Sequence, residues 1–142
     1  MIINRQRRVS LVLKPLEDFL ERVRRELHFP DGSVTIRLVS DDAIARLNRT
    51  FRHRPGPTDV LSFPVGGEAG AWSAEYVGDI AISPETARRN ARRMGRALPA
   101  EMRVLILHGM LHLAGFDHET DHGEMERFER RLRRRLGVVG RS

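Results

Sequence analysis

Three histidines in the last third of the chain are spaced so that they can hold one metal ion. They lie in the segment His108-Gly-Met-Leu-His112-Leu-Ala-Gly115-Phe-Asp-His118. Residues four apart share one face of a helix, so His108 and His112 can bind the same ion. Gly115 favours a left-handed turn that ends the helix and can return His118 to that ion. The spacing therefore predicts a metal site with three imidazole ligands.

The complete lack of cysteine limits the chemistry of this site. It excludes disulfides, thiolate catalysis and iron–sulfur clusters. Zinc with three protein ligands and one open position is typical of catalytic sites, whereas structural zinc sites are usually rich in cysteine. We therefore expect one zinc ion per chain on His108, His112 and His118, in a hydrolase. Asp117 is a candidate to orient a ligand imidazole from behind, although a turn or capping role explains this carboxylate equally well.

The same histidine spacing occurs in the metzincin proteases, whose motif is H-E-x-x-H-x-x-G-x-x-H. In those proteases the glutamate is the general base that activates water. Here Gly109 stands in its place. The substitution argues against a peptidase, while another metal-dependent hydrolase remains an alternative.

The chain is strongly basic, with a formal charge of +6 and a sequence pI of about 11.2. Every basic residue except Lys14 is an arginine, and arginine binds phosphate bidentately. This composition favours a polyanionic partner such as RNA, although a GC-rich genome also explains it. The helix expected after Ser83 carries a basic face that predicts a phosphate track; the alternative is a solvated charged face. Its members are Arg88, Arg89, Arg92, Arg93 and Arg96.

Hydrophobic periodicity and turn residues predict a mixture of helices and strands. An apolar stripe predicts a helix over residues 15–27, and alternation predicts a strand over 34–39. Ser40 is expected to cap a helix that directs Ile44, Leu47 and Phe51 inward. A loop over 52–58, strands over 59–63 and 76–82, and helices beginning near Ser83, Pro99 and Asp121 complete the prediction, with helix ends at Gly115 and Gly137. We expect an α+β fold in one domain over residues 1–142, with about four strands in a small mixed sheet covered by about five helices.

No apolar run approaches the roughly 18 residues of a membrane span, and the first residues lack the pattern of a signal peptide. We therefore expect a cytoplasmic protein that does not enter membranes.

Three blocks of sequence resemble the YbeY-type endoribonucleases, also called ribosomal RNA maturation factors, over nearly the whole chain. The blocks are Leu47-Asn-Arg-Thr-Phe-Arg52 with Pro57-Thr-Asp-Val-Leu-Ser-Phe-Pro64, then Gly78-Asp-Ile-Ala-Ile-Ser83, then His108 to His118. The resemblance implies an α+β fold, a metal usually taken as zinc on the three histidines, and cleavage of single-stranded RNA. It also implies maturation of the 3′ end of 16S small-subunit ribosomal RNA, ribosome quality control, and contact with the ribosome or its proteins.

The resemblance singles out Arg52, which we expect to lie in a loop and to stabilise charge at the scissile phosphate, while His108 acts with the metal. Either water or the adjacent ribose hydroxyl can serve as the nucleophile. Thr58, Asp59 and Asp79 are further candidates, each explained equally well by turns or strand ends. The alternative function is a non-catalytic ribosome-assembly factor with a structural zinc.

Overall fold

The computed structural model places an open four-stranded sheet between helices on its two faces. It describes residues 1–67, 70, 75–116 and 123–138. The strands in these ranges are β1 (Ile2–Asn4), β2 (Val34–Leu38), β3 (Val60–Pro64) and β4 (Gly78–Ile82). The α-helices in the same ranges are α1 (Leu13–Glu26), α2 (Asp41–Arg52), α3 (Pro84–Met94), α4 (Leu98–Leu113) and α5 (Glu124–Leu136). The predicted α+β fold is confirmed.

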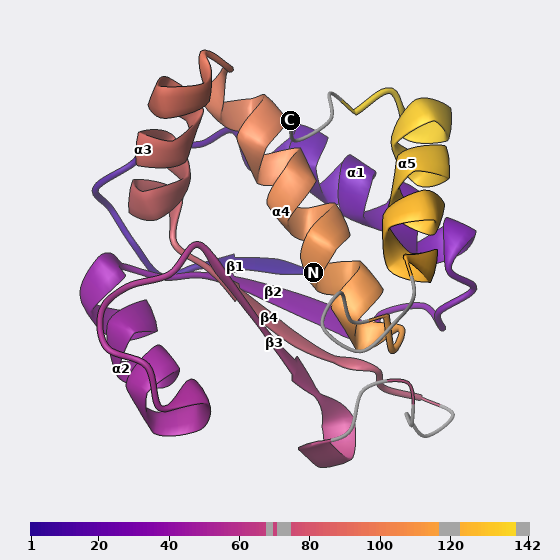
Figure 1. Cartoon of the computed structure of the whole chain (residues 1–142), viewed down its shortest axis with the longest axis horizontal. Coiled ribbons are helices and arrows are strands. Elements are labelled where there is room, and N and C mark those ends of the chain that lie inside the picture. The colour runs from indigo at the N-terminus through magenta and orange to yellow at the C-terminus, as the bar shows by residue number, and fades with distance from the viewer. Residues whose placement is uncertain (68–69, 71–74, 117–122, 139–142) are drawn as a thin grey trace.

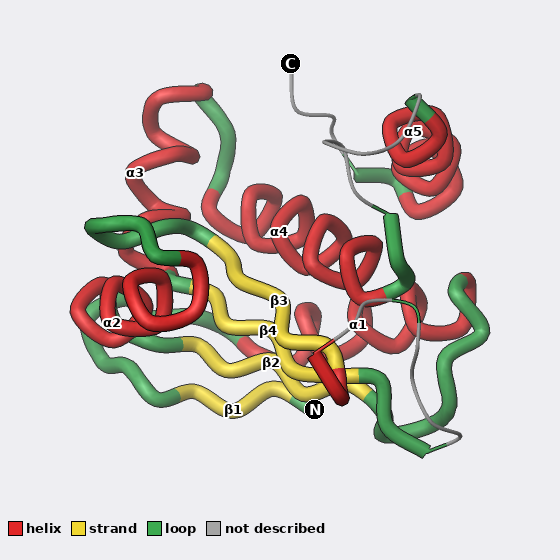
Figure 2. The backbone as a smooth tube through the Cα atoms, turned by 60° about the horizontal axis from the view of Figure 1, so that its bottom comes forward, coloured by secondary structure: helices red, strands yellow, loops and turns green. Residues whose placement is uncertain are grey.

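The strands lie in the order β1-β2-β4-β3. β1, β2 and β4 run parallel, and β3 pairs antiparallel with β4. β3 therefore forms one edge of the sheet, with one side free of a strand neighbour in the described chain (Figure 2). Successive side chains of a strand point to opposite faces, so an edge strand can line a cavity on each face.

The helices are divided unequally between the two faces. Figure 1 shows α1, α3, α4 and α5 on one side of the strands and α2 on the other. α4 contacts α1, α3 and α5 as well as β3 and β4. A helix with so many neighbours must be apolar almost all round, and the run Val104–Leu107 is fully buried.

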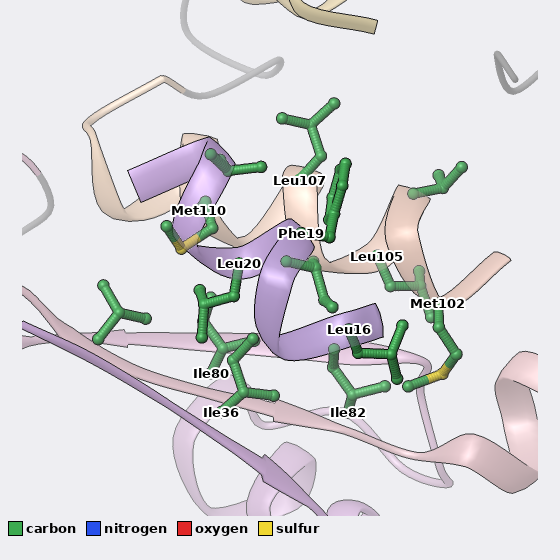
Figure 3. Packing of buried hydrophobic residues seen from close by; sticks show 14 of the residues in the cluster. Leu16, Phe19, Leu20, Ile36, Ile80, Ile82, Met102, Leu105, Leu107 and Met110 are labelled. Atoms are coloured by element: carbon green, nitrogen blue, oxygen red, sulfur yellow. The ribbon is translucent and has the colours of Figure 1, made fainter. Parts of the chain in front are cut away.

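The main core lies between α1, α4 and the sheet (Figure 3). α1 contributes Leu16, Phe19 and Leu20, and the strands contribute Ile36, Ile80 and Ile82. α4 completes this layer with Met102, Leu105, Leu107 and Met110. Burying one large apolar side chain contributes about 1.5–3 kcal/mol, so this layer fixes how α4 is rotated. Rotation of α4 decides where His108 and His112 point.

Several predicted helix ends are confirmed. The Ser40 side chain accepts a hydrogen bond from the Ala43 amide at 3.1 Å. Ser83 does the same from Thr86 at 3.3 Å, with Pro84 in the first turn. Gly137 ends α5 in the left-handed conformation. The first helix begins two residues earlier than predicted, at Leu13.

Two details of the prediction are wrong, and a third concerns a residue that the structure does not describe. Phe51 does not point inward, because at the last turn of α2 its ring meets Phe63 and remains 59% exposed. Asn48 is buried instead. Arg52 lies in the last turn of α2 rather than in a loop, since the helix continues until His53 adopts a left-handed conformation. α5 is capped by Gly123 without a side-chain hydrogen bond, and Asp121 lies outside the described residues.

Within the described ranges, no helix is both long enough and apolar enough to cross a membrane.

Candidate active site

A polar cleft of about 620 Å³ opens between α2, the following loop, β3 and α4. We call it the histidine cleft, because His108 and His112 of α4 line one side. The lining also includes Arg52 from the end of α2 and Arg54 from the loop. The remaining lining residues are Asn48, Pro55, Pro57, Thr58, Asp59, Val60, Leu61, Ser62, Pro64 and Gly67. Imidazole and guanidinium groups therefore line the same cavity.

The two histidines are arranged as ligands of one ion would be. Their Nε2 atoms lie 3.0 Å apart, and their rings meet edge to face with centroids 4.6 Å apart. Two nitrogens bound to one zinc ion at about 2.0–2.1 Å in tetrahedral geometry are about 3.3 Å apart. The donor atoms of His108 and His112 thus fit a shared ion with only a small change in separation.

Packing of α4 against β3 and β4 explains why the histidines face the cleft. Gly109 is buried, and a Cβ atom there would lie 3.0 Å from two side-chain carbons of Ile80. The Gly109 carbonyl also accepts a hydrogen bond from the Ser62 hydroxyl at 3.0 Å, which fastens β3 to α4. Position 109 therefore faces the sheet, and His108 and His112 are left on the side of the cleft.

A carboxylate lies behind His108. Glu129 Oε1 is 3.4 Å from Nδ1 of that histidine, and Glu129 Oε2 is 3.2 Å from Arg133. The side chains of Glu129 and Arg133 are only 10% and 9% exposed. A carboxylate that accepts from Nδ1–H fixes the ring orientation and leaves Nε2 as the donor toward a metal.

The sequence analysis missed Glu129, because it lies in α5, 21 residues from His108. Among many charges on that helix, no local signal distinguishes it. The fold brings it close through the turn at Gly115 and through Phe116, whose ring stacks on Phe128 with centroids 4.9 Å apart.

The arginine side of the cleft is shaped by a buried amide. Asn48 Nδ2 donates to the Gly56 carbonyl at 3.0 Å, across the start of the loop. Asn48 and Arg52 are four residues apart, so both lie on the cleft side of α2. Arg54, which the sequence analysis did not single out, lines the same cavity.

The other three candidate residues, Thr58, Asp59 and Asp79, lie in two different places. Thr58 and Asp59 line the histidine cleft, and Asp59 accepts a hydrogen bond from Asn90 of α3 at 3.1 Å. Asp79 lies outside the cleft. It accepts a hydrogen bond from Tyr76 and lies 3.7 Å from Arg37. Burial, followed by the hydrogen bond to Asp79, raises the pKa of Tyr76 above its usual value.

The five arginines predicted as a phosphate track have different surroundings. Arg92 and Arg93 are exposed and, with Arg89, line a shallow depression. Arg88 is partly buried. Arg96 is 10% exposed and lies 3.1 Å from Glu101, whose side chain is fully buried. This ion pair with Glu101 accounts for the position of Arg96 without any contact to RNA.

Arg89 also helps to join the starts of α2 and α3. Asp41 accepts hydrogen bonds from Ser83 at 2.6 Å, from Thr86 at 2.7 Å and from Arg89 at 2.8 Å. Burial raises the pKa of Asp41, but these hydrogen bonds and the charge of Arg89 outweigh it. The pKa of Asp41 therefore lies below its usual 3.8.

Two of the three predicted metal ligands are therefore together. His118 and Asp117 lie outside the described residues. Among the side chains that the structure describes, no group of three or more histidines and carboxylates is placed to hold an ion.

Comparisons with known proteins agree on one family. The family model described as "Endoribonuclease YbeY" matches residues 1–137. A protein of that name from Koribacter versatilis is 45% identical over 138 residues, covering 96% of this chain and 85% of its own. Another, from Geobacter metallireducens, is 36% identical over 143 residues, which cover 99% of this chain and 95% of the relative. The solution structure of TM1509 from Thermotoga maritima is 32% identical with a TM-score of 0.65, covering 96% of this chain and 89% of its own.

Proposed function

The chain belongs to the endoribonuclease YbeY family, and from this premise we propose that it is a zinc-dependent endoribonuclease that cuts single-stranded RNA. Family membership supports an RNA-cleaving hydrolase. Zinc and the single-stranded substrate are the further steps. The observation that supports zinc is the 3.0 Å approach of the two Nε2 atoms in a cavity that Arg52 also lines, and the single-stranded substrate follows from the family resemblance.

In this proposal His108, His112 and His118 hold the zinc ion, one per chain. A zinc ion in that position supplies Lewis acidity for phosphodiester hydrolysis. Arg52 binds the scissile phosphate and stabilises the negative charge that grows on it. Glu129 keeps the His108 ring oriented, and we keep Asp117 as a candidate for the same task at another ligand.

The substrate that the family resemblance suggests is the 3′ end of 16S small-subunit ribosomal RNA, with a part in ribosome quality control. We propose that the protein acts there as a single domain, in the cytoplasm, in contact with the ribosome or its proteins. The exposed arginines of α3 support an extended RNA contact. Asn90, which lines their depression, also donates to Asp59 in the histidine cleft, so the two regions are adjacent.

The test measures zinc content and cleavage of a labelled single-stranded RNA by the wild type, His112→Ala and Arg52→Ala. Arg46→Ala is the matched control, because Arg46 is an exposed residue of α2 that does not line the cleft. We expect about one zinc per wild-type chain, loss of zinc and cleavage in His112→Ala, and loss of cleavage alone in Arg52→Ala. Losing one group that stabilises transition-state charge lowers the rate about 100- to 1,000-fold.

The main rival is a ribosome-assembly factor that does not cut RNA. It predicts equal residual cleavage in all four proteins, and cells in which Arg52→Ala replaces the wild type without a ribosome defect. The proposal would be refuted if every variant bound zinc and cut the RNA as fast as the wild type does.

A further inference from the structure

A second hollow lies on the opposite face of β3 from the histidine cleft. It has a volume of about 240 Å³, and its apolar walls include Val39, Leu47, Phe51 and Phe63. We call it the phenylalanine groove. Phe51 is 59% exposed and meets Phe63 edge to face, with ring centroids 5.2 Å apart. An aromatic side chain this exposed is not explained by packing of the core.

The groove and the cleft are built from the same two elements. In α2, Asn48 and Arg52 line the cleft, whereas their neighbours Leu47 and Phe51 line the groove. In β3, Phe63 lines the groove, whereas Val60, Leu61, Ser62 and Pro64 line the cleft. Consecutive residues of both elements therefore contribute to the two cavities, which makes the cavities neighbours.

Two charged residues border this apolar groove. Arg37 and Asp79 line it, and their charged groups lie 3.7 Å apart with side chains 44% and 35% exposed. A nucleobase has two flat apolar faces and an edge of hydrogen-bond donors and acceptors. Aromatic walls with an adjacent guanidinium and carboxylate match both parts of such a ligand.

We propose that the phenylalanine groove is a nucleobase subsite, which stacks one base of the RNA strand whose phosphate lies at Arg52. The inference rests on the proposed function. The occupant is a base of that strand because Phe51, which lines the groove, directly precedes Arg52, which lines the cleft. The ring of Phe51 provides the stacking surface, and the Arg37–Asp79 rim contacts the edge of the base.

The test compares Phe51→Leu with Phe51→Tyr in binding to a labelled single-stranded RNA. Leucine keeps an apolar side chain but removes the flat ring, whereas tyrosine keeps the ring. Binding is measured by fluorescence anisotropy on the zinc-loaded protein at low temperature, with the RNA recovered intact on a gel. Stacking of a base on an aromatic ring contributes about 1–3 kcal/mol. We therefore expect Phe51→Leu to weaken Kd by about 5- to 150-fold and Phe51→Tyr to change it by less than about threefold.

A scan with one abasic position at a time identifies the stacked base. At one position, removal of the base should weaken RNA binding by the wild type. Removal of the same base should leave binding by Phe51→Leu unchanged. Met94→Ala, which truncates another exposed apolar side chain, is the control and should bind normally. Melting temperatures of all variants check that the fold is retained.

Two outcomes would overturn the inference: Phe51→Leu binding every RNA like the wild type, or abasic losses that are equal in both proteins. The groove would then fit a protein partner better than a base. If the wild type neither binds nor cuts single-stranded RNA, the proposed function itself fails. A wild type that cuts RNA and a Phe51→Leu variant indistinguishable from it refute the base subsite alone.

Discussion

Gly109 provides a direct test of how α4 is rotated, because the structure and the protease motif give it opposite surroundings. A metzincin would carry its catalytic glutamate there, facing the metal. In this chain a Cβ atom at position 109 would lie 3.0 Å from two carbons of the Ile80 side chain. Ile80 is fully buried in β4, between β2 and β3. We therefore expect Gly109→Ala and Gly109→Glu to destabilise the fold and to produce no peptidase activity.

The expected size of the effect follows from two opposing contributions. Replacing glycine by alanine inside a helix gains about 1 kcal/mol in propensity. Overpacking a close-packed core costs about 1–3 kcal/mol, and Ile80 has little room to retreat within the sheet. Gly109→Ala should therefore lower the free energy of unfolding by about 1 kcal/mol. Gly109→Glu additionally buries a carboxylate against Ile80, and its cost should exceed about 4 kcal/mol.

Urea unfolding followed by circular dichroism measures both effects. Ile80→Val removes Cδ1, one of the two Ile80 atoms that would lie 3.0 Å from the new Cβ, and should cost about 0.5–1.5 kcal/mol by itself. In the Ile80→Val background, Gly109→Ala should lower the free energy of unfolding by less than it does in the wild type. The coupling energy between the two substitutions should be at least about 0.5 kcal/mol. A Gly109→Glu protein as stable as the wild type would show that position 109 faces solvent. The rotation of α4 and the placement of the histidines would then be wrong.

Three further predictions concern charged groups. Glu129→Gln should weaken zinc binding by about 10- to 100-fold in a competition assay with a chelator, while unchanged affinity would mean that Glu129 does not orient His108. Arg96→Ala should lower the free energy of unfolding by about 3 kcal/mol, because it takes a partner from the buried Glu101; unchanged stability with weaker RNA binding would instead assign Arg96 to the phosphate track. Asp41→Asn should destabilise the protein at pH 7. The pKa of Asp41 in the folded protein lies below its usual value of 3.8. The ionised carboxylate therefore stabilises the fold fully above pH 3.8, and this contribution is lost as the pH falls through the pKa of the folded protein. The stability difference from the wild type should therefore shrink only below about pH 4 in unfolding measured from pH 7 to pH 2.

Features set by local sequence were predictable. The caps at Ser40 and Ser83 and the glycine end of α5 depend on residues within one helical turn, and the structure confirms them. The pairing of His108 with His112 has the same origin, since four residues separate them on one helix. Helical periodicity alone places both side chains on one face.

Features set by tertiary contacts were not predictable in this way. Periodicity places Phe51 on the inner face of α2 with Ile44, but it does not show that the ring meets Phe63 and stays largely exposed. Glu129 approaches His108 because α5 packs against α4 through contacts that include the stacked rings of Phe116 and Phe128. Such contacts depend on where a helix ends relative to its neighbours.

The position of β3 at the sheet edge connects these observations with function. A central strand would have both of its sides occupied by neighbouring strands, and no ligand could pass across it. An edge strand with alternating side chains instead gives a cleft on one face and a groove on the other. α2 lies at one end of the strands (Figure 2) and supplies two adjacent i, i+4 pairs, one to each cavity. The same arrangement therefore places Arg52 in the cavity of the histidines and Phe51 in the apolar groove.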